Sequence, residues 1–217
     1  MSTSRTSIRW RIAQAAEHRW WRNYLSGKDV DDYLAWKRGY WHGFLKTLDL
    51  SADALDRPVL DAGCGPAGLF TILSGDVTAL DPLLDRYGAL DVFDRSMHPD
   101  VRFVTGSLED LNDKDRYATI ACLNAINHVA DLGEALDRLV AALAPGGRLL
   151  LSTDAHRHGW LKPLFRAVPA DVLHPHQHDR ADYRAMLEQR GLVIETEVVM
   201  KREAIFEYVV WCCAPRS

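Results

Sequence analysis

The sequence predicts an α/β fold with a mostly parallel, seven-stranded sheet, helices on both of its faces and an antiparallel last strand. Two observations lead to this prediction. Five short apolar runs alternate with helical patterns between Pro58 and Asp154, and two strand-like runs with a short connection close the chain. Buried strands separated by helices are typical of a parallel sheet. Strands joined by a short connection can only pair antiparallel.

Two amphipathic helices are expected before the sheet, at residues 7–26 and 30–48. Their apolar stripes are Trp10, Ala13, Ala16, Trp20 and Tyr24 in the first, and Tyr33, Trp36, Tyr40, Phe44 and Leu48 in the second. Such stripes usually pack into a core. Trp21 and Trp41 are then expected off the core face, where extra aromatic rings would line a lid or favour a cationic amine.

The sheet is expected to form from strands at residues 58–62, 76–81, 101–106, 117–124 and 147–154, followed by an edge pair at 192–200 and 204–213. The clearest connecting helix spans Asp131 to Leu143, and the sequence APGG at 144–147 is expected to turn the chain into the next strand. Residues 155–178, with three prolines and five histidines, interrupt this alternation of strands and helices. A helix is expected after them, at about 179–190.

These elements fit a single domain with four parts. We expect an N-terminal helical cap (1–50), a ligand-binding core (58–154), a histidine-rich substrate segment with its helix (155–190) and a final strand pair (191–217).

Composition indicates a globular protein without a strong charge. The sequence is 47% hydrophobic and 26% charged, and its net charge of −4 argues against a polyanionic partner for the whole chain. The basic N-terminal segment, Met1 to Lys28, fits either an anionic partner or a solvated helix face. The four cysteines show no C-x-x-C spacing, and no long apolar window is present, so we expect a cytoplasmic protein with reduced cysteines.

A glycine-rich loop gives the first functional signal. The sequence VLDAGCGPAGLF at 59–70 places Gly63, Gly65 and Gly68 directly after a buried strand, and Asp81 ends the next strand. A strand that leads into such a loop presents backbone N–H groups to a nucleotide, and the acid can accept hydrogen bonds from ribose hydroxyls. The alternative is a tight turn without a ligand. With a ligand, the candidates are NAD-type dinucleotides and S-adenosylmethionine.

Further motifs decide between these cofactors. VLDAGCGPAG, ALDP (79–82), GSLEDL (106–111), TIACLNAINHVAD (119–131) and LAPGGRLLLS (143–152) occur in one order and spacing. In these motifs the chain resembles the class I S-adenosylmethionine-dependent methyltransferases, over residues 58–154. The resemblance implies a Rossmann-like fold, S-adenosylmethionine as cofactor and methyl transfer as the reaction.

The resemblance also implies cofactor contacts. Asp61 and Gly63 would lie near the methionine part, Asp81 would hold the ribose, Leu108 would offer its N–H to the adenine, and Asn124 would approach the cofactor's amino group. Cys64, Gly65 and Pro82 would lie beside these contacts. Where Ser107 stands the family often has an acid that accepts from the adenine amino group; the serine hydroxyl can accept too, and Glu109 is close.

Histidines are the candidate catalytic residues. His128 follows the fourth strand beside Asn127, where the turn would face the transferring methyl, or else it is a satisfied neighbour of a helix N-cap. His174, His176 and His178 form the sequence HPHQH, which fits a substrate-facing cluster, a surface loop or a metal site. A metal site at this sequence would need further ligands, and no nearby acid or cysteine completes the pattern, so we expect no metal. We expect His128, His174 and His176 to be catalytic, and Trp21, Tyr24, Tyr40, Asn127 and His178 to bind the acceptor.

Four functions remain open from the sequence. A methyltransferase for a small molecule, with oxygen or nitrogen as acceptor atom, fits the single domain best. The others are a methyltransferase for tRNA, one for a membrane-associated lipid or quinone, and a cofactor-binding module without catalysis. The sequence does not indicate the oligomeric state.

Overall fold

The computed structural model describes residues 8–157 and 178–216, with side chains from residue 14 onward. One seven-stranded sheet forms the centre, in the order β3-β2-β1-β4-β5-β7-β6. The strands are β1 (Val59–Ala62), β2 (Val77–Asp81), β3 (Val101–Thr105), β4 (Tyr117–Leu123), β5 (Leu143–His156), β6 (Leu192–Arg202) and β7 (Phe206–Pro215). The α-helices are α1 (Ile8–Leu25), α2 (Val30–Lys46), α3 (Leu84–Tyr87), α4 (Leu132–Ala142) and α6 (Arg180–Gln189).

Strand directions confirm the predicted sheet. β1 to β5 pair in parallel, whereas β7 pairs antiparallel with both β5 and β6. The carboxyl ends of β1, β2, β3, β4 and β5 therefore meet at one edge. Open α/β sheets bind ligands at this edge.

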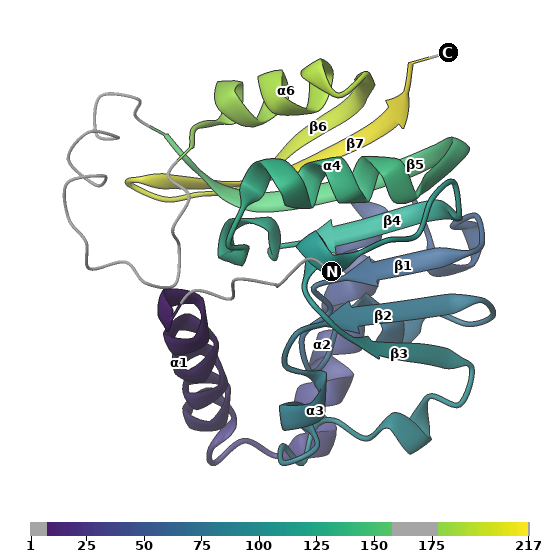
Figure 1. Ribbon diagram of the computed structural model, residues 1–217. Helices are drawn as coiled ribbons and strands as arrows, with labels where there is room; N and C mark the ends of the chain where they lie inside the picture. The colour runs from purple at the N-terminus through teal and green to yellow at the C-terminus, as the bar shows by residue number, and fades with distance from the viewer. Residues whose placement is uncertain (1–7, 158–177, 217) are drawn as a thin grey trace.

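Helices cover both faces of the sheet (Figure 1). α4 and α6 lie on one face and α2 lies on the other, while α1 stands apart, beside the edge toward which β4 points. Each face has its own apolar core, which explains the paired cysteines: Cys212 belongs to one core and Cys213 to the other. All four cysteines are buried and free.

Two element boundaries differ from those expected. α4 ends at Ala142 and β5 begins at Leu143, because Leu143 already pairs with Tyr117. The next pair is Thr119 with Arg148, so residues 144–147 form an irregularity inside one long strand. The helical patterns before β3 are also shorter than expected: one 3-10 turn, Leu69–Ile72, follows β1, and the four-residue α3 follows β2.

The aromatic stripes of the first two helices were partly mispredicted. On α2, Trp36 is 55% exposed, whereas Trp41, expected off the core face, is 6% exposed. Trp41 is buried because its indole N–H donates to the carbonyl of Ala67 in the glycine-rich loop, 3.0 Å away. On α1, Trp20 and Tyr24 are exposed, and they stack on one another with ring centroids 4.8 Å apart. The side chains of Trp10 and Ala13 lie outside the described part.

No helix within residues 8–157 and 178–216 is long and apolar enough to cross a membrane.

Candidate active site

The glycine-rich loop is shaped by close contacts that exclude side chains. Gly63 has a φ of +72°, and a Cβ on it would lie 2.3 Å from the Cβ of Ala125. A Cβ on Gly68 would lie 2.3 Å from the carbonyl oxygen of Cys64. Only glycine combines this backbone conformation with this close approach to the strand ends. The loop therefore stays flat against the carboxyl edge of β1 and β4.

A pocket of about 740 Å³ opens at this edge. Its volume lies within the range of about 300–1,000 Å³ that is usual for small-molecule sites. The strand ends and the loops that follow them contribute Gly63, Cys64, Gly65, Pro66, Ala67, Asp81, Pro82, Ser107, Leu108, Glu109, Leu123, Asn124, Ala125, Asn127, His128, Val129 and Asp154. The helices and the last two strands contribute Gln14, Glu17, Trp20, Trp21, Tyr24, Tyr33, Trp36, Lys37, Tyr40, Trp41, Lys201, Glu203, Phe206 and Tyr208.

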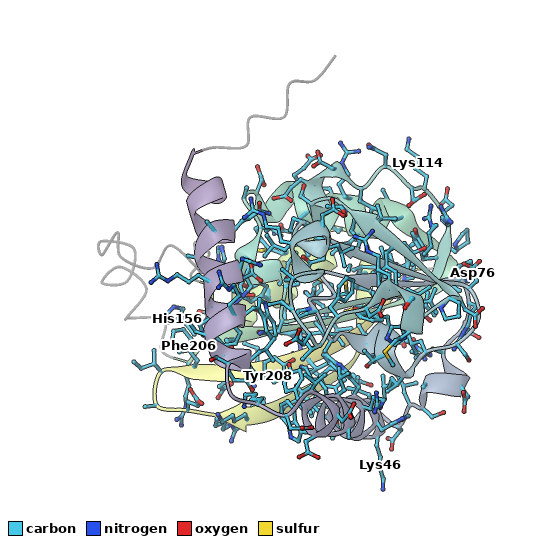
Figure 2. All side chains as sticks on the ribbon, turned by 90° about the horizontal axis from the view of Figure 1, so that it is seen from below. Lys46, Asp76, Lys114, His156, Phe206 and Tyr208 are labelled. Carbon is cyan, nitrogen blue, oxygen red and sulfur yellow. The ribbon has the colours of Figure 1, made fainter. Side chains whose placement is uncertain are left out.

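Figure 2 shows the same arrangement from below. Phe206 and Tyr208 of β7 lie on the side of the molecule where α1 stands. Asp76 and Lys114, which precede β2 and β4, lie toward the other side. The pocket therefore belongs to the carboxyl edge of the sheet, and α1 forms part of its wall.

Asp81 lines the pocket with its carboxylate already engaged. Its two oxygens accept from the backbone N–H groups of Gly65 and Leu83, at 2.9 and 2.8 Å. Burial raises the pKa of Asp81 to about 6, although these two hydrogen bonds lower it. Each carboxylate oxygen keeps a second lone pair for a ligand hydroxyl. Asp81 thus supports the glycine loop and still presents an acceptor to the pocket.

Asp61, expected near the methionine part of the cofactor, is the third residue of β1. It is 2% exposed and does not line the pocket. Its Oδ2 accepts from the N–H of Phe70 at 2.8 Å, and burial raises its pKa to about 7. Asp61 therefore holds the far side of the glycine loop.

The loop after β3 forms the floor of the pocket with Ser107, Leu108 and Glu109. The Ser107 hydroxyl donates to Asp110 at 2.8 Å, so its lone pairs stay available as acceptors. Oε1 of Glu109 accepts from the N–H groups of Ala130 and Asp131, at 2.7 and 3.1 Å. Glu109 therefore ties this loop to the turn that precedes α4.

Asn124 ends β4 in a left-handed conformation with a φ of +55°. Its N–H donates to Ser152 Oγ at 3.0 Å, and Ser152 Oγ shares a 2.8 Å hydrogen bond with the Tyr208 hydroxyl. Tyr208 and Tyr40 of α2 both line the pocket. Hydrogen bonds thus connect the end of β4 with β7 in the pocket wall. Burial raises the pKa of both phenols, which keeps them neutral donors.

The predicted histidines fall into three groups. His128 is half-buried in the 3-10 turn Ile126–His128 and lines the pocket, next to Asn127. Asn127 is 2% exposed, and its Oδ1 has no hydrogen-bond partner among the described residues. His178 does not line the pocket: its Nδ1 is 3.4 Å from Asp182 Oδ2, at the start of α6. His174 and His176 lie outside the described residues.

The residues of α1 and α2 that line the pocket were found only in part from the sequence. Trp21, Tyr24 and Tyr40 were expected there and are present, whereas Glu17 and Lys37 were not considered. Burial, aided by the charge of Asp81, raises the pKa of Glu17 to about 7. Isolated charged residues on amphipathic helices usually face solvent, so nothing in the sequence singled them out.

Within the described residues, no group of three or more histidine, cysteine or acidic side chains is arranged to hold a metal ion.

A family model described as a methyltransferase domain matches residues 33–197. The chain belongs to this methyltransferase-domain family. Curated relatives include a ubiquinone biosynthesis O-methyltransferase from Nitrobacter winogradskyi, 35% identical over 99 residues, and another from a Bradyrhizobium species, 31% identical over 99 residues. The first match covers 44% of this chain and 38% of the relative, and the second covers 44% and 39%.

Solved structures share the fold at low sequence identity. The YcgJ protein of Bacillus subtilis has a TM-score of 0.63 at 15% identity, covering 82% of this chain and 99% of that one. Geranyl diphosphate C-methyltransferase of Streptomyces coelicolor has a TM-score of 0.64 at 18% identity, covering 81% and 75%. The 1,6-didemethyltoxoflavin-N1-methyltransferase of Burkholderia thailandensis has a TM-score of 0.60 at 17% identity, covering 100% and 92%. The last two were crystallised with S-adenosylhomocysteine.

The pocket fits S-adenosylmethionine in its chemistry. The glycine loop allows close backbone approach, and Asp81 retains acceptor capacity for hydroxyls. Aromatic rings on the opposite wall supply apolar surface for the rest of the ligand.

Proposed function

We propose that this methyltransferase acts on a small organic acceptor, bound between the strand ends and the aromatic wall of α1 and α2. The observation that supports this proposal most is the shape of the site. The cofactor loop and the aromatic wall line one pocket, and α1 stands over the edge where methyl transfer takes place in this fold. A roofed pocket of this size suits a small molecule and excludes water from the reaction.

The cofactor supplies an activated methyl group on a positively charged sulfur. In our proposal Asp81 accepts hydrogen bonds from the ribose hydroxyls, and the Leu108 N–H and Ser107 face the adenine. Gly63, Gly65, Cys64 and Pro82 surround the cofactor. Asp61 acts on these contacts through the loop that it holds. Asn124 offers its carbonyl to the cofactor's amino group.

His128 is our proposed base for the acceptor. It lines the pocket next to the end of β4, and an imidazole near neutral pH can accept the proton of a hydroxyl or amine. Tyr24, Tyr40, Trp21 and Asn127 would orient the acceptor. Oxygen is the acceptor atom that the names of the curated relatives favour, since they are O-methyltransferases.

The segment of residues 155–190 remains our proposed substrate segment within a single domain, with residues 1–50 as a cap, 58–154 as the cofactor-binding core and 191–217 as the final strand pair. His174 and His176 keep a proposed role toward the acceptor. His178 would act only by positioning this segment, through its contact with Asp182.

The test begins with a screen of metabolite extracts using a labelled methyl donor. On the acceptor found, His128→Ala should lower kcat by about 10²–10⁴-fold while S-adenosylmethionine affinity stays nearly unchanged. His174→Ala and His176→Ala should raise the acceptor's KM or lower kcat. His42→Ala is the matched control, because His42 is exposed on α2 outside the pocket. Wild-type turnover in His128→Ala, His174→Ala and His176→Ala would show that the histidines are structural.

A second candidate is an acceptor that resides in a membrane, such as a lipid or quinone. The exposed rings of Trp20, Tyr24 and Trp36 favour it, since all three also line the pocket. Aromatic side chains at an entrance suit a membrane interface. Co-sedimentation with anionic vesicles should then be lost in the Trp20→Ser, Trp36→Ser double variant, and retention of binding by that variant would remove this candidate.

A further inference from the structure

Lys37 is a cation held inside the pocket by aromatic rings. Its Nζ lies 4.5 Å from the ring centroid of Trp41, 4.9 Å from that of Tyr40 and 5.8 Å from that of Trp36. These distances are in the range of cation–π contacts. The three rings leave the ammonium group in the pocket wall, where a ligand can reach it.

The neighbours of Lys37 are anchored on both sides, which defines its position. Trp41, one helical turn later, is bonded to Ala67 in the glycine loop. Tyr40 lines the pocket together with Tyr208 of β7, which is hydrogen-bonded to Ser152. Lys37 therefore projects between the glycine loop and the acceptor side of the pocket.

No carboxylate among the described residues forms an ion pair with Lys37, although the charge of Asp61 acts on it. Among the described residues that line the pocket the lysines are Lys37 and Lys201 and none is an arginine. Lys201 forms an ion pair with Glu203. Lys37 forms no ion pair with any described carboxylate within 4.0 Å. Burial lowers the pKa of Lys37 to about 8, and the charge of Asp61 only partly opposes this effect.

We propose that Lys37 is the carboxylate-binding residue of this pocket. A partly buried ammonium group surrounded by aromatic faces retains three N–H donors and no anionic partner. A carboxylate from a ligand would supply both the charge and the acceptors, and charge-assisted hydrogen bonds are strong in such surroundings.

Two sources can supply this carboxylate. One is the amino-acid end of S-adenosylmethionine, because Trp41, one turn along α2, donates to Ala67 and so holds this part of the helix against the glycine loop. The other is an acidic acceptor, and this second source rests on the proposed small-molecule function. The first source does not depend on the acceptor, so the two proposals can fail separately.

The experiment compares two cofactor analogues that differ in the amino-acid end. S-adenosylhomocysteine carries it and 5′-methylthioadenosine lacks it. Calorimetric titration is carried out with the wild type, Lys37→Met, Lys37→Arg and Lys46→Met; Lys46 is exposed at the far end of the same helix (Figure 2). The same proteins, saturated with S-adenosylhomocysteine, are then titrated with benzoate and with the neutral benzamide.

If the cofactor supplies the carboxylate, Lys37→Met lowers the affinity for S-adenosylhomocysteine at least about 10-fold. The affinity for 5′-methylthioadenosine then stays within about twofold of wild type, and Lys37→Arg retains most of the affinity for S-adenosylhomocysteine. If the acceptor supplies it, both nucleosides bind unchanged and Lys37→Met loses the preference for benzoate over benzamide. In either case the wild type takes up protons when it binds the carboxylate ligand at pH 8, because the bound carboxylate raises the lowered pKa of Lys37. Lys37→Met with unchanged affinities for all four ligands would overturn the proposal, even if the wild type methylates a small molecule.

Discussion

Replacing Asp81 with Asn separates what this carboxylate does for the loop from what it does for a ligand. Asp81 is 6% exposed and accepts from the N–H groups of Gly65 and Leu83. Its pKa rises from 3.8 to about 6, which means that the charge is costly in the ligand-free protein. At about 1.4 kcal/mol per pKa unit, carrying this charge at pH 7 costs about 3 kcal/mol of folding free energy.

The substitution has opposing effects on stability and one effect on affinity. Asn removes the buried charge, which stabilises the protein, but it loses an acceptor toward one of the two backbone N–H groups. These effects nearly cancel, and we expect the free energy of unfolding to change by less than about 1 kcal/mol. Ribose hydroxyls that donate to a charged group contribute about 1.5–3 kcal/mol, so affinity for S-adenosylhomocysteine should fall about 10- to 150-fold.

Urea unfolding of the ligand-free protein and calorimetric titration with S-adenosylhomocysteine measure the two quantities. Asp85→Asn is the control, since Asp85 is exposed in the same turn and bonds only to Arg95 and Thr105. Asp81→Ala should weaken binding to a similar degree. Affinity within twofold of wild type in Asp81→Asn would refute the ribose assignment and leave Asp81 as a support for the glycine loop.

Three further predictions concern the loop and the cap. Gly63→Ala should lower the free energy of unfolding by about 2–4 kcal/mol, because its Cβ would overlap that of Ala125 at positive φ; Gly39→Ala, at an open helical site, is the control for urea unfolding. Glu17 has a raised pKa of about 7, so its contribution to stability is present below about pH 4.5 and is lost as the pH rises to about 7. Tryptophan fluorescence should therefore report looser docking of α1 at pH 8 than at pH 6, and an unchanged pH profile in Glu17→Gln would contradict this. Hydrogen exchange in residues 8–46 should slow when S-adenosylhomocysteine binds, whereas unchanged protection would leave α1 and α2 as ordinary packing.

The sheet could be predicted from the sequence because its strands are short apolar runs bounded by glycines, prolines and acids. The edge pair was predictable for the same reason, since a short connection leaves only an antiparallel partner. Trp41 was misplaced because periodicity locates an apolar face only to within about one residue. Its burial depends on a hydrogen bond to Ala67, which no local pattern reveals.

The sequence placed most of the residues expected at the cofactor on one edge of the sheet, where they line the pocket. Gly63, Asp81 and Leu108 follow strand ends, and parallel strands bring their carboxyl ends to one edge. Lys37 and Tyr208 come from a helix and a strand whose sequences give no sign of a shared pocket. Only the packing of α2 against the sheet brings them together, and this information lies in tertiary contacts.

The order of the strands has a consequence for how the pocket assembles. Tyr40 lies in α2, whereas Tyr208 lies in β7, which inserts between β5 and β6. Domains fold largely as units during synthesis, N-terminal parts first. The glycine loop and α2 therefore leave the ribosome before the part of the wall that β7 supplies. The pocket is complete only once β7 has paired with both of its neighbours.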